Sequence, residues 1–155
     1  IHFILLPKYR GCHTNYLQIK NGEKKSGVTL HKIDSGIDTG DIIDQLTFKL
    51  DLNTNAFQNY NQLMNYSLKI LKKNFSKIMQ KRYKLKKQIN SLSTYFNRSF
   101  VNYKKEKFLK KKSNSMKFHN KVRALIFPPL QLPILNRKKI INSSFSKKKV
   151  YLNYL

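Results

Sequence analysis

The spacing of hydrophobic residues divides the chain into short strand-like segments and one long helical segment. Residues 1–6, 27–33 and 42–50 are rich in β-branched and other apolar side chains over strand-length runs, so each predicts a strand. Residues 54–83 change period, because apolar positions recur every three or four residues: Ala56, Phe57, Tyr60, Leu63, Met64, Leu68, Leu71, Phe75, Ile78 and Met79. This spacing predicts a long amphipathic helix whose apolar stripe packs against a core.

Capping and chain-breaking residues place the shorter elements. Residues 14–20 predict a short helix that ends at Asn21-Gly22. Residues 116–125 predict a second one, which ends before a pair of prolines. The tail contains two strand candidates, residues 139–142 and 150–154. The mixture of strands and helices predicts an α/β fold.

The chain of 155 residues is long enough for one domain with a core of its own. It begins at Ile1 inside an apolar run, so we interpret it as the C-terminal part of something longer, truncated at its N-terminus. We divide it into a first region over residues 1–83, a basic connecting segment over 84–115, and a small helix-plus-strands region over 116–155.

Charge separates the first third of the chain from the rest. The net charge is +25, but residues 1–51 carry seven basic and six acidic residues, whereas residues 52–155 carry 25 basic residues and one acid. Such a field favours polyanions. The excess is nearly all Lys in a chain also rich in Asn and Ile, so base composition of the gene explains it as well. Both interpretations stay open.

Other composition features exclude several classes of protein. The single cysteine, Cys12, rules out an internal disulfide framework and suits a reducing compartment. No apolar run approaches the roughly 20 residues that span a bilayer. No Cys and His cluster has the spacing of metal ligands, so we predict no metal. We expect a cytoplasmic protein that does not bind membranes.

Candidate chemistry gathers in the first 41 residues. His2 lies in the first predicted strand, and the loop over residues 34–41 carries Asp38. Polar residues at the carboxyl edge of an α/β sheet are where such folds place their chemistry. A carboxylate beside an imidazole orients the ring and suits it to acid/base catalysis. Spacing alone is a weak signal, because a lone pair of His and Asp is more often structural than catalytic.

Several segments resemble the 10-formyltetrahydrofolate-dependent formyltransferases. Residues 1–11, Ile-His-Phe-Ile-Leu-Leu-Pro-Lys-Tyr-Arg-Gly, are similar to the Asn-x-His-Pro-Ser-Leu-Leu-Pro-x-Tyr-Arg-Gly segment of that family. Residues 27–31 and 36–43 resemble its second signature, and the 36 positions that separate His2 from Asp38 fit as well. Residues 121–129 resemble its Arg-Ala-x-x-x-Pro-Pro stretch.

The resemblance implies a fold and a set of roles. The fold would be the C-terminal half of a Rossmann-like formyltransferase domain, followed by a long helix and a small basic C-terminal region. His2 and Asp38 would be catalytic, together with an asparagine two positions before His2 that this sequence does not contain. The 10-formyltetrahydrofolate donor would bind at Ile4, Leu5, Leu6, Pro7 and Asp34. Because much of the implied site lies upstream, we expect the fragment alone to be inactive.

The family members differ in the amine that accepts the formyl group. Residues 11–23 and 127–133 are more similar to the amino-sugar branch, which implies transfer to the amino group of a nucleotide-linked amino sugar. Methionyl-tRNA is the alternative acceptor, and an inactive fragment with a basic, nucleic-acid-binding tail is a second alternative. Arg10, His13 and Arg123 are candidate substrate ligands, although His13 also suits a helix-capping turn and Arg123 a helix end. A homodimer stays open.

Overall fold

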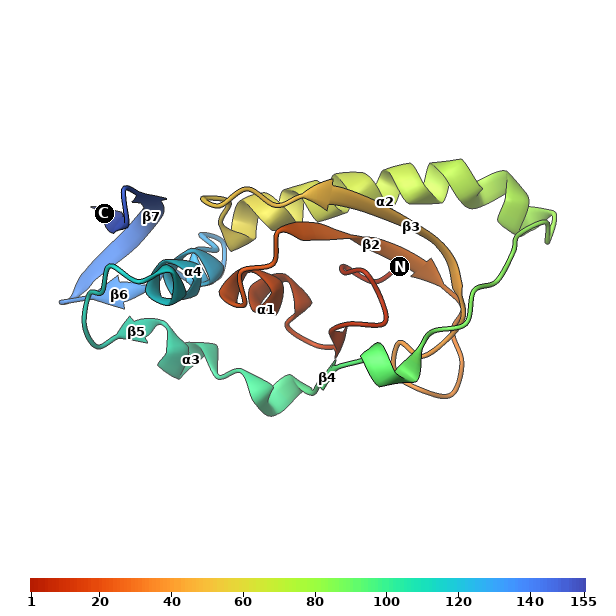
Figure 1. Ribbon diagram of the computed structural model, residues 1–155, viewed down its shortest axis with the longest axis horizontal. Coiled ribbons are helices and arrows are strands. Elements are labelled where there is room, and N and C mark those ends of the chain that lie inside the picture. The colour runs from red at the N-terminus through yellow and green to blue at the C-terminus, as the bar shows by residue number, and fades with distance from the viewer. The chain divides into compact units, whose positions relative to one another are not determined.

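The computed structural model describes residues 1–155, which form two compact units. Unit 1 comprises residues 1–14, 25–49 and 61–98, and unit 2 comprises residues 15–24, 50–60 and 99–155. This grouping differs from the three consecutive regions expected, because sheet pairing joins segments that are distant in sequence. The α/β fold is confirmed (Figure 1).

Unit 1 is built on an antiparallel hairpin that a helix covers. Strand β2 (Lys25–His31) pairs with β3 (Ile42–Lys49), with a register shift between Leu30 and His31. The helix α2 (Ala56–Met79) runs along this hairpin (Figure 1). The core consists of buried residues from the hairpin and the helix: Val28, Leu30, Leu63 and Ile70. The helix predicted over 54–83 is thus confirmed, although it is shorter at both ends and spans residues 56–79.

Only part of the apolar stripe predicted for this helix is buried. Leu63 and Ile70 are fully buried on the face that meets the hairpin. A second row of apolar side chains is 41 to 69 % exposed: Met64, Leu68, Leu71, Phe75 and Met79. The assignment of all these positions to a core was therefore wrong. The apolar side chains extend around more of the helix surface than the single hairpin of β2 and β3 covers.

The first six residues do not form the strand that was predicted. His2 makes one antiparallel bridge with Thr29, by backbone hydrogen bonds of 2.8 and 2.9 Å. The chain then turns, because the Thr29 hydroxyl donates to Ile4 O and accepts from Leu6 N. Strand β1 (Arg10–Gly11) follows and pairs in parallel with β4 (Tyr95–Phe96).

Unit 2 combines short helices with a four-stranded sheet. Its strands, in the spatial order β5-β6-β7-β8, are Phe108–Leu109, Ile134–Leu135, Lys138–Ser146 and Lys149–Tyr154. The helix α4 (Met116–Leu125) contacts β7, and Ser115 caps its first turn through a hydrogen bond from Phe118 N. The helix α1 (Thr14–Lys20) and α4 have the predicted bounds, whereas the tail strands are longer than predicted.

Short elements fill the predicted connecting segment: the 3-10 helices η1 (Asn90–Leu92) and η2 (Arg98–Phe100), and the helix α3 (Tyr103–Glu106). No helix of the structure has both the length and the apolar character needed to cross a membrane.

Candidate active site

The structure brings His2 and Asp38 together in unit 1. His2 Nδ1 lies 3.6 Å from Asp38 Oδ2, and the two side chains are 12 % and 21 % exposed. His2 Nε2 lies 3.0 Å from the carbonyl oxygen of Tyr9. A carbonyl can only accept, so Nε2 carries a hydrogen and Nδ1 is the ring atom that faces the carboxylate.

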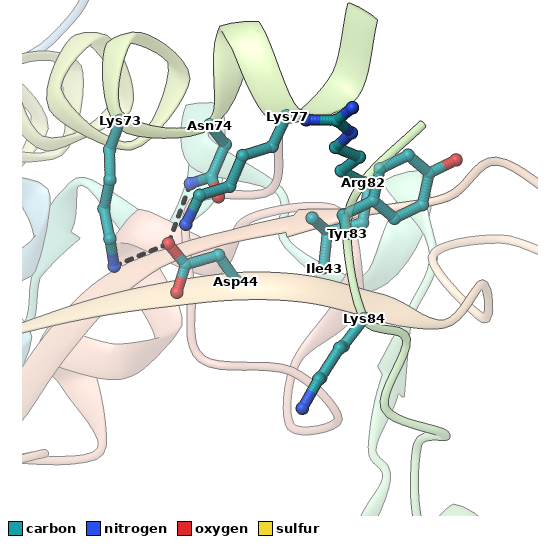
Figure 2. A pocket seen from close by; sticks show the side chains of 8 residues that line it. All are labelled: Ile43, Asp44, Lys73, Asn74, Lys77, Arg82, Tyr83 and Lys84. Atoms are coloured by element: carbon teal, nitrogen blue, oxygen red, sulfur yellow. Dashed lines mark hydrogen bonds and ion pairs between the residues drawn. The ribbon is translucent and has the colours of Figure 1, made fainter. Parts of the chain in front are cut away.

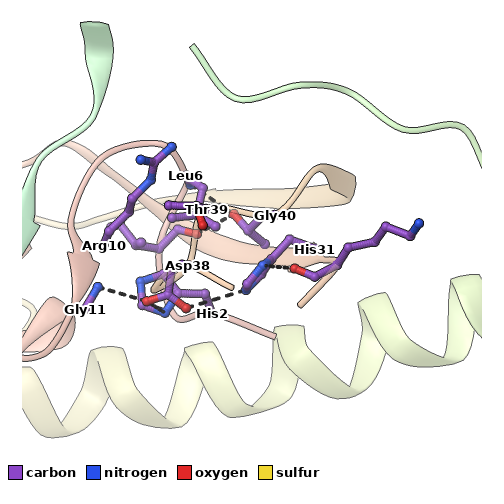
Figure 3. A network of polar contacts seen from close by, with 12 residues as sticks. His2, Leu6, Arg10, Gly11, His31, Asp38, Thr39 and Gly40 are labelled. Carbon is purple, nitrogen blue, oxygen red and sulfur yellow. Dashed lines mark hydrogen bonds and ion pairs between the residues drawn. The ribbon is translucent and has the colours of Figure 1, made fainter. Parts of the chain in front are cut away.

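Asp38 is the centre of this polar network, and Figure 3 shows its carboxylate between the side chains of His2 and His31 and the backbone of Gly11. Gly11 N donates to Asp38 Oδ2 at 2.8 Å. The φ of Asp38 is +55°, in the left-handed region that aspartate tolerates better than most residues. Local backbone geometry and one amide donor therefore aim the carboxylate at the histidines.

His31 is a member of the network that sequence reasoning missed. Its Nε2 lies 3.7 Å from Asp38 Oδ1, and its Nδ1 donates to Lys32 O at 2.7 Å. Burial lowers the pKa of His31, although the Lys32 carbonyl and the Asp38 charge act in the opposite direction. Strand alternation does not reveal this role, because it cannot show that His31 ends β2 beside the Asp38 loop.

The Asp38 loop, defined as residues 34–41, is held by hydrogen bonds more than by burial. Asp34 Oδ1 accepts from the Thr39 hydroxyl at 2.6 Å and from Gly36 N at 3.2 Å. The Thr39 hydrogen bond lowers the pKa of Asp34. Ile37, in contrast, is 57 % exposed. Asp34 thus shapes the loop, and its expected contact with a folate stays a prediction.

The four apolar residues expected to line a folate pocket divide into two pairs. Ile4 and Leu6 are buried, and their backbone groups already bond to Thr29 and Gln45. Leu5 and Pro7 are partly exposed. Of these four, Leu5 and Pro7 are therefore the residues whose side chains are accessible to a ligand.

The structure gives Arg10 and His13 partners within the protein. The buried Arg10 guanidinium donates to Gln88 Oε1 and to Asn90 Oδ1. These bonds hold it within the protein, so it is not exposed for a substrate as a candidate ligand would be. His13 Nε2 donates to Arg98 O at 2.8 Å. Its own φ is +63°, which fits the turn before α1.

Arg123, a candidate substrate ligand, and His119 both lie inside unit 2. Arg123 is 2 % exposed and donates to Asn120 Oδ1, Asp51 O and Thr54 O. Burial lowers the pKa of its guanidinium to about 10. It therefore cannot meet a substrate phosphate as it stands. His119 is fully buried between Ser143 Oγ and Leu52 O.

A cavity of about 340 Å³ lies beside α2 and β3, with Lys73, Lys77, Arg82 and Lys84 among its lining residues. Figure 2 shows the Asp44 carboxylate, which accepts from Lys73 Nζ and Asn74 Nδ2, both at 2.8 Å. Burial acts to raise the pKa of Asp44, but these hydrogen bonds outweigh it and lower the pKa. Nothing in the cavity resembles the imidazole–carboxylate pair.

Comparison with known proteins identifies the family. Residues 1–74, which contain His2, His31 and Asp38, match the model of the formyl transferase family. A Helicobacter canadensis N-formyltransferase, solved with folinic acid and dTDP-3-aminofucose, is 43 % identical with a TM-score of 0.86, over 92 % of this chain and 52 % of that one. Residues 1–74 of the chain thus fit the formyltransferase family.

Two further relatives of the chain differ in the acceptors that their names give. WlaRD, a sugar 3N-formyl transferase, is 45 % identical with a TM-score of 0.86, over 94 % of this chain and 53 % of that one. The methionyl-tRNA formyltransferase of Kosmotoga olearia is 34 % identical over 80 % of this chain and 39 % of its own length. The chain thus spans about half the length of the two sugar enzymes and less of the tRNA enzyme.

Proposed function

We propose that the protein transfers a formyl group from 10-formyltetrahydrofolate to the amino group of a nucleotide-linked amino sugar in the cytoplasm. The observation that carries this proposal is the His2–Asp38 pair, 3.6 Å apart within the matched residues 1–74. Solved relatives that carry folates and a dTDP-amino sugar support the class of donor and acceptor.

The roles of the two residues follow from their atoms. As the amine attacks the formyl carbon it becomes cationic and must lose a proton. His2 Nδ1, which faces Asp38, is the ring nitrogen that can accept this proton, because Nε2 already carries the hydrogen bound to Tyr9 O. Asp38 Oδ2 then stabilises the resulting imidazolium. The folate, when bound, supplies the formyl carbon and the leaving nitrogen. His2 would pass its proton to that nitrogen as the bond between the nitrogen and the formyl carbon breaks.

The residues beside this pair suit a flat, largely apolar donor. Leu5 and Pro7 offer partly exposed apolar surface, and Ile37 is 57 % exposed next to Asp38. Exposed apolar groups beside a polar network are typical of a ligand pocket. We infer that these three side chains contact the folate, with Asp34 holding the loop that carries Ile37.

The proposal specifies the compound that donates the formyl group more closely than the amine that accepts it, so we compare the two candidate acceptors. Sugar formyltransferases match this chain at 43 and 45 % identity over more than nine tenths of it, and the methionyl-tRNA enzyme matches at 34 % over 80 %. This difference favours an amino sugar. Methionyl-tRNA is the alternative acceptor, and only a direct comparison of substrates separates the two.

The test is formyl transfer by the protein expressed from its complete reading frame. The protein would be incubated with 10-formyltetrahydrofolate and either a dTDP-amino sugar or methionyl-tRNA, and the products analysed by mass spectrometry. We expect the mass increase of one formyl group on the sugar nucleotide only. His2→Ala should abolish it, whereas Asp51→Asn, a remote carboxylate change, should not. Formylation of the tRNA alone would select the alternative, and activity of His2→Ala would refute the role of His2.

A second candidate function rests on the charge of the tail. Residues 107–155 carry thirteen basic residues and no acid, which favours binding to nucleic acid. RNA affinity measured at several salt concentrations tests it. Binding that weakens steeply with salt would support this candidate, and absent or salt-insensitive binding would eliminate it.

A further inference from the structure

A strap of the chain, residues 82–96, passes the Asp38 loop on its way from α2 to β4 (Figure 1). Lys86 forms two backbone hydrogen bonds with Ile42, of 2.8 and 2.9 Å. Further along, Thr94 accepts from Tyr9 N through its hydroxyl and from Arg10 N through its carbonyl. The strap therefore contacts both segments that surround the His2–Asp38 pair.

Gln88 lies between these two anchors and uses all of its hydrogen-bonding capacity. Its Nε2 donates to Asp38 O at 2.9 Å and to Gly40 O at 2.8 Å. Its Oε1 accepts from Arg10 Nε at 3.1 Å and from Nη2 at 2.9 Å. A side-chain amide offers two donors and two acceptor lone pairs, so the four bonds saturate it.

These bonds close a ring around Asp38. Gln88 holds the backbone carbonyl of Asp38, and it also holds Arg10. The next residue, Gly11, donates its amide to the Asp38 carboxylate at 2.8 Å. The backbone carbonyl and the side-chain carboxylate of Asp38 are thus linked to one another, through Gln88 on one side and the neighbours Arg10 and Gly11 on the other. Asn90 adds a third bond to the Arg10 guanidinium, at 3.0 Å.

The Asp38 loop needs such support because burial does not provide it. Ile37 is 57 % exposed, and Ile33, just before the loop, is 96 % exposed. Asp38 itself has a φ of +55°, which a free chain rarely adopts at an aspartate. Hydrogen bonds to fixed partners are therefore the main restraint on where its carboxylate points.

We propose that Gln88 is a positioning residue, which fixes the backbone of Asp38 so that its carboxylate stays beside His2 and His31. The consequence for catalysis rests on the proposed formyl transfer, whereas the geometric part can be measured without turnover. Gln88 does not touch the reacting atoms and acts through Asp38.

Two substitutions distinguish the hydrogen bonds that the Gln88 amide donates from those that it accepts. Gln88→Met removes all four bonds while keeping similar bulk. Gln88→Glu keeps an acceptor for Arg10 but places an oxygen against the carbonyls of Asp38 and Gly40. Gln80→Met and Gln80→Glu are matched controls, because Gln80 is exposed just beyond α2 and bonds only locally, through its backbone and to the Ser76 hydroxyl.

The first measurement is amide hydrogen exchange by NMR, on the protein expressed from its complete reading frame. In Gln88→Met and Gln88→Glu we expect exchange of the Gly11 amide to quicken about tenfold, because its acceptor on Asp38 moves away. Exchange of Val28 and Leu30, in the core of the hairpin, should stay within about twofold of wild type. The Gln80 variants should behave like wild type.

The second measurement is the titration of His31 by NMR, which a merely structural glutamine would not alter. The Asp38 charge raises the pKa of His31, so its displacement in Gln88→Met should lower that pKa further. The other charges acting on His31, His2 and the N-terminal amine, are unchanged. In an Asp38→Asn background, Gln88→Met should produce no additional shift.

The third measurement is kcat of formyl transfer, which should fall about tenfold in both Gln88 variants. Unchanged Gly11 exchange together with an unchanged His31 titration would overturn the proposal. Uniformly faster exchange, including Val28 and Leu30, would also overturn it, since Gln88 would then only stabilise the unit. If wild type transfers no formyl group while the first two measurements behave as expected, the proposed function fails and the placement of Asp38 by Gln88 is supported.

Discussion

Replacement of Asp38 by Asn tests the charge of the carboxylate apart from its shape. Asparagine retains an oxygen that can accept from Gly11 N, so the loop keeps its local bond. The amide carries no charge to stabilise an imidazolium at His2 Nδ1. The variant therefore isolates the electrostatic contribution of Asp38 to the proton transfer that we propose.

The magnitude follows from the 3.6 Å separation of His2 Nδ1 and Asp38 Oδ2. Two unit charges at that distance interact by about 4–5 kcal/mol at an effective dielectric constant of about 20. Because the side chains are 12 % and 21 % exposed, water screens part of this energy. We take about 2 kcal/mol as the effective contribution, which corresponds to a loss of about thirtyfold in rate.

The assay is steady-state formyl transfer with the protein expressed from its complete reading frame. We expect kcat of Asp38→Asn to fall about thirtyfold, with a much smaller change in KM, because the charge is needed only when His2 holds the proton. Asp51→Asn controls for a carboxylate change elsewhere. A kcat within twofold of wild type would refute the electrostatic role, since it would show that the imidazolium does not depend on this carboxylate.

Three further predictions concern the stability of the two units. Leu63→Ala, in the buried core, should lower the free energy of unfolding by about 2–5 kcal/mol in urea titrations, whereas Leu68→Ala on the exposed row should change it by about 0.5 kcal/mol or less. Arg123→Leu should cost about 3 kcal/mol in the same titration, because the carbonyls of Asp51 and Thr54 lose their donor; an unchanged midpoint would contradict the buried contacts. Burial lowers the pKa of His119, so the unfolded chain binds a proton more readily and stability should fall as pH drops below about 6.5. Calorimetric Tm against pH checks this, and His119→Asn should flatten the acid side of the curve.

Sequence reasoning succeeded where the signal is local. The bounds of helices 14–20 and 116–125 follow from capping and breaking residues within a few positions of each end. His2 and Asp38 were found because each lies in a recognisable segment, and the structure places them in contact. Their roles in catalysis stay predictions until the variants are assayed.

Sequence reasoning failed where a partner is distant in sequence. Gln88 lies 50 residues from Asp38 and 78 from Arg10, in a segment that looked like a plain connection. His119 lies on a helix with several basic residues, and the partners that bury it, Ser143 and Leu52, are 24 and 67 residues away. No local pattern encodes such pairings, because they arise only when sheets and loops assemble.

The structure shows what the acidic and the basic parts of the chain each contribute to the His2–Asp38 site. The residues that the basic part contributes to Asp38 and Arg10 are neutral: Gln88, Asn90 and Thr94. Its lysine runs, residues 110–112 and 147–149, are exposed instead. The charged chemistry of the site therefore comes from the first 51 residues, where six of the seven acids lie. A few of its basic residues bind acids within the protein, as Lys73 binds Asp44 and Lys121 binds Glu106. The geometry of the His2–Asp38 pair does not require the rest of the basic excess, which is therefore available for contacts with another molecule.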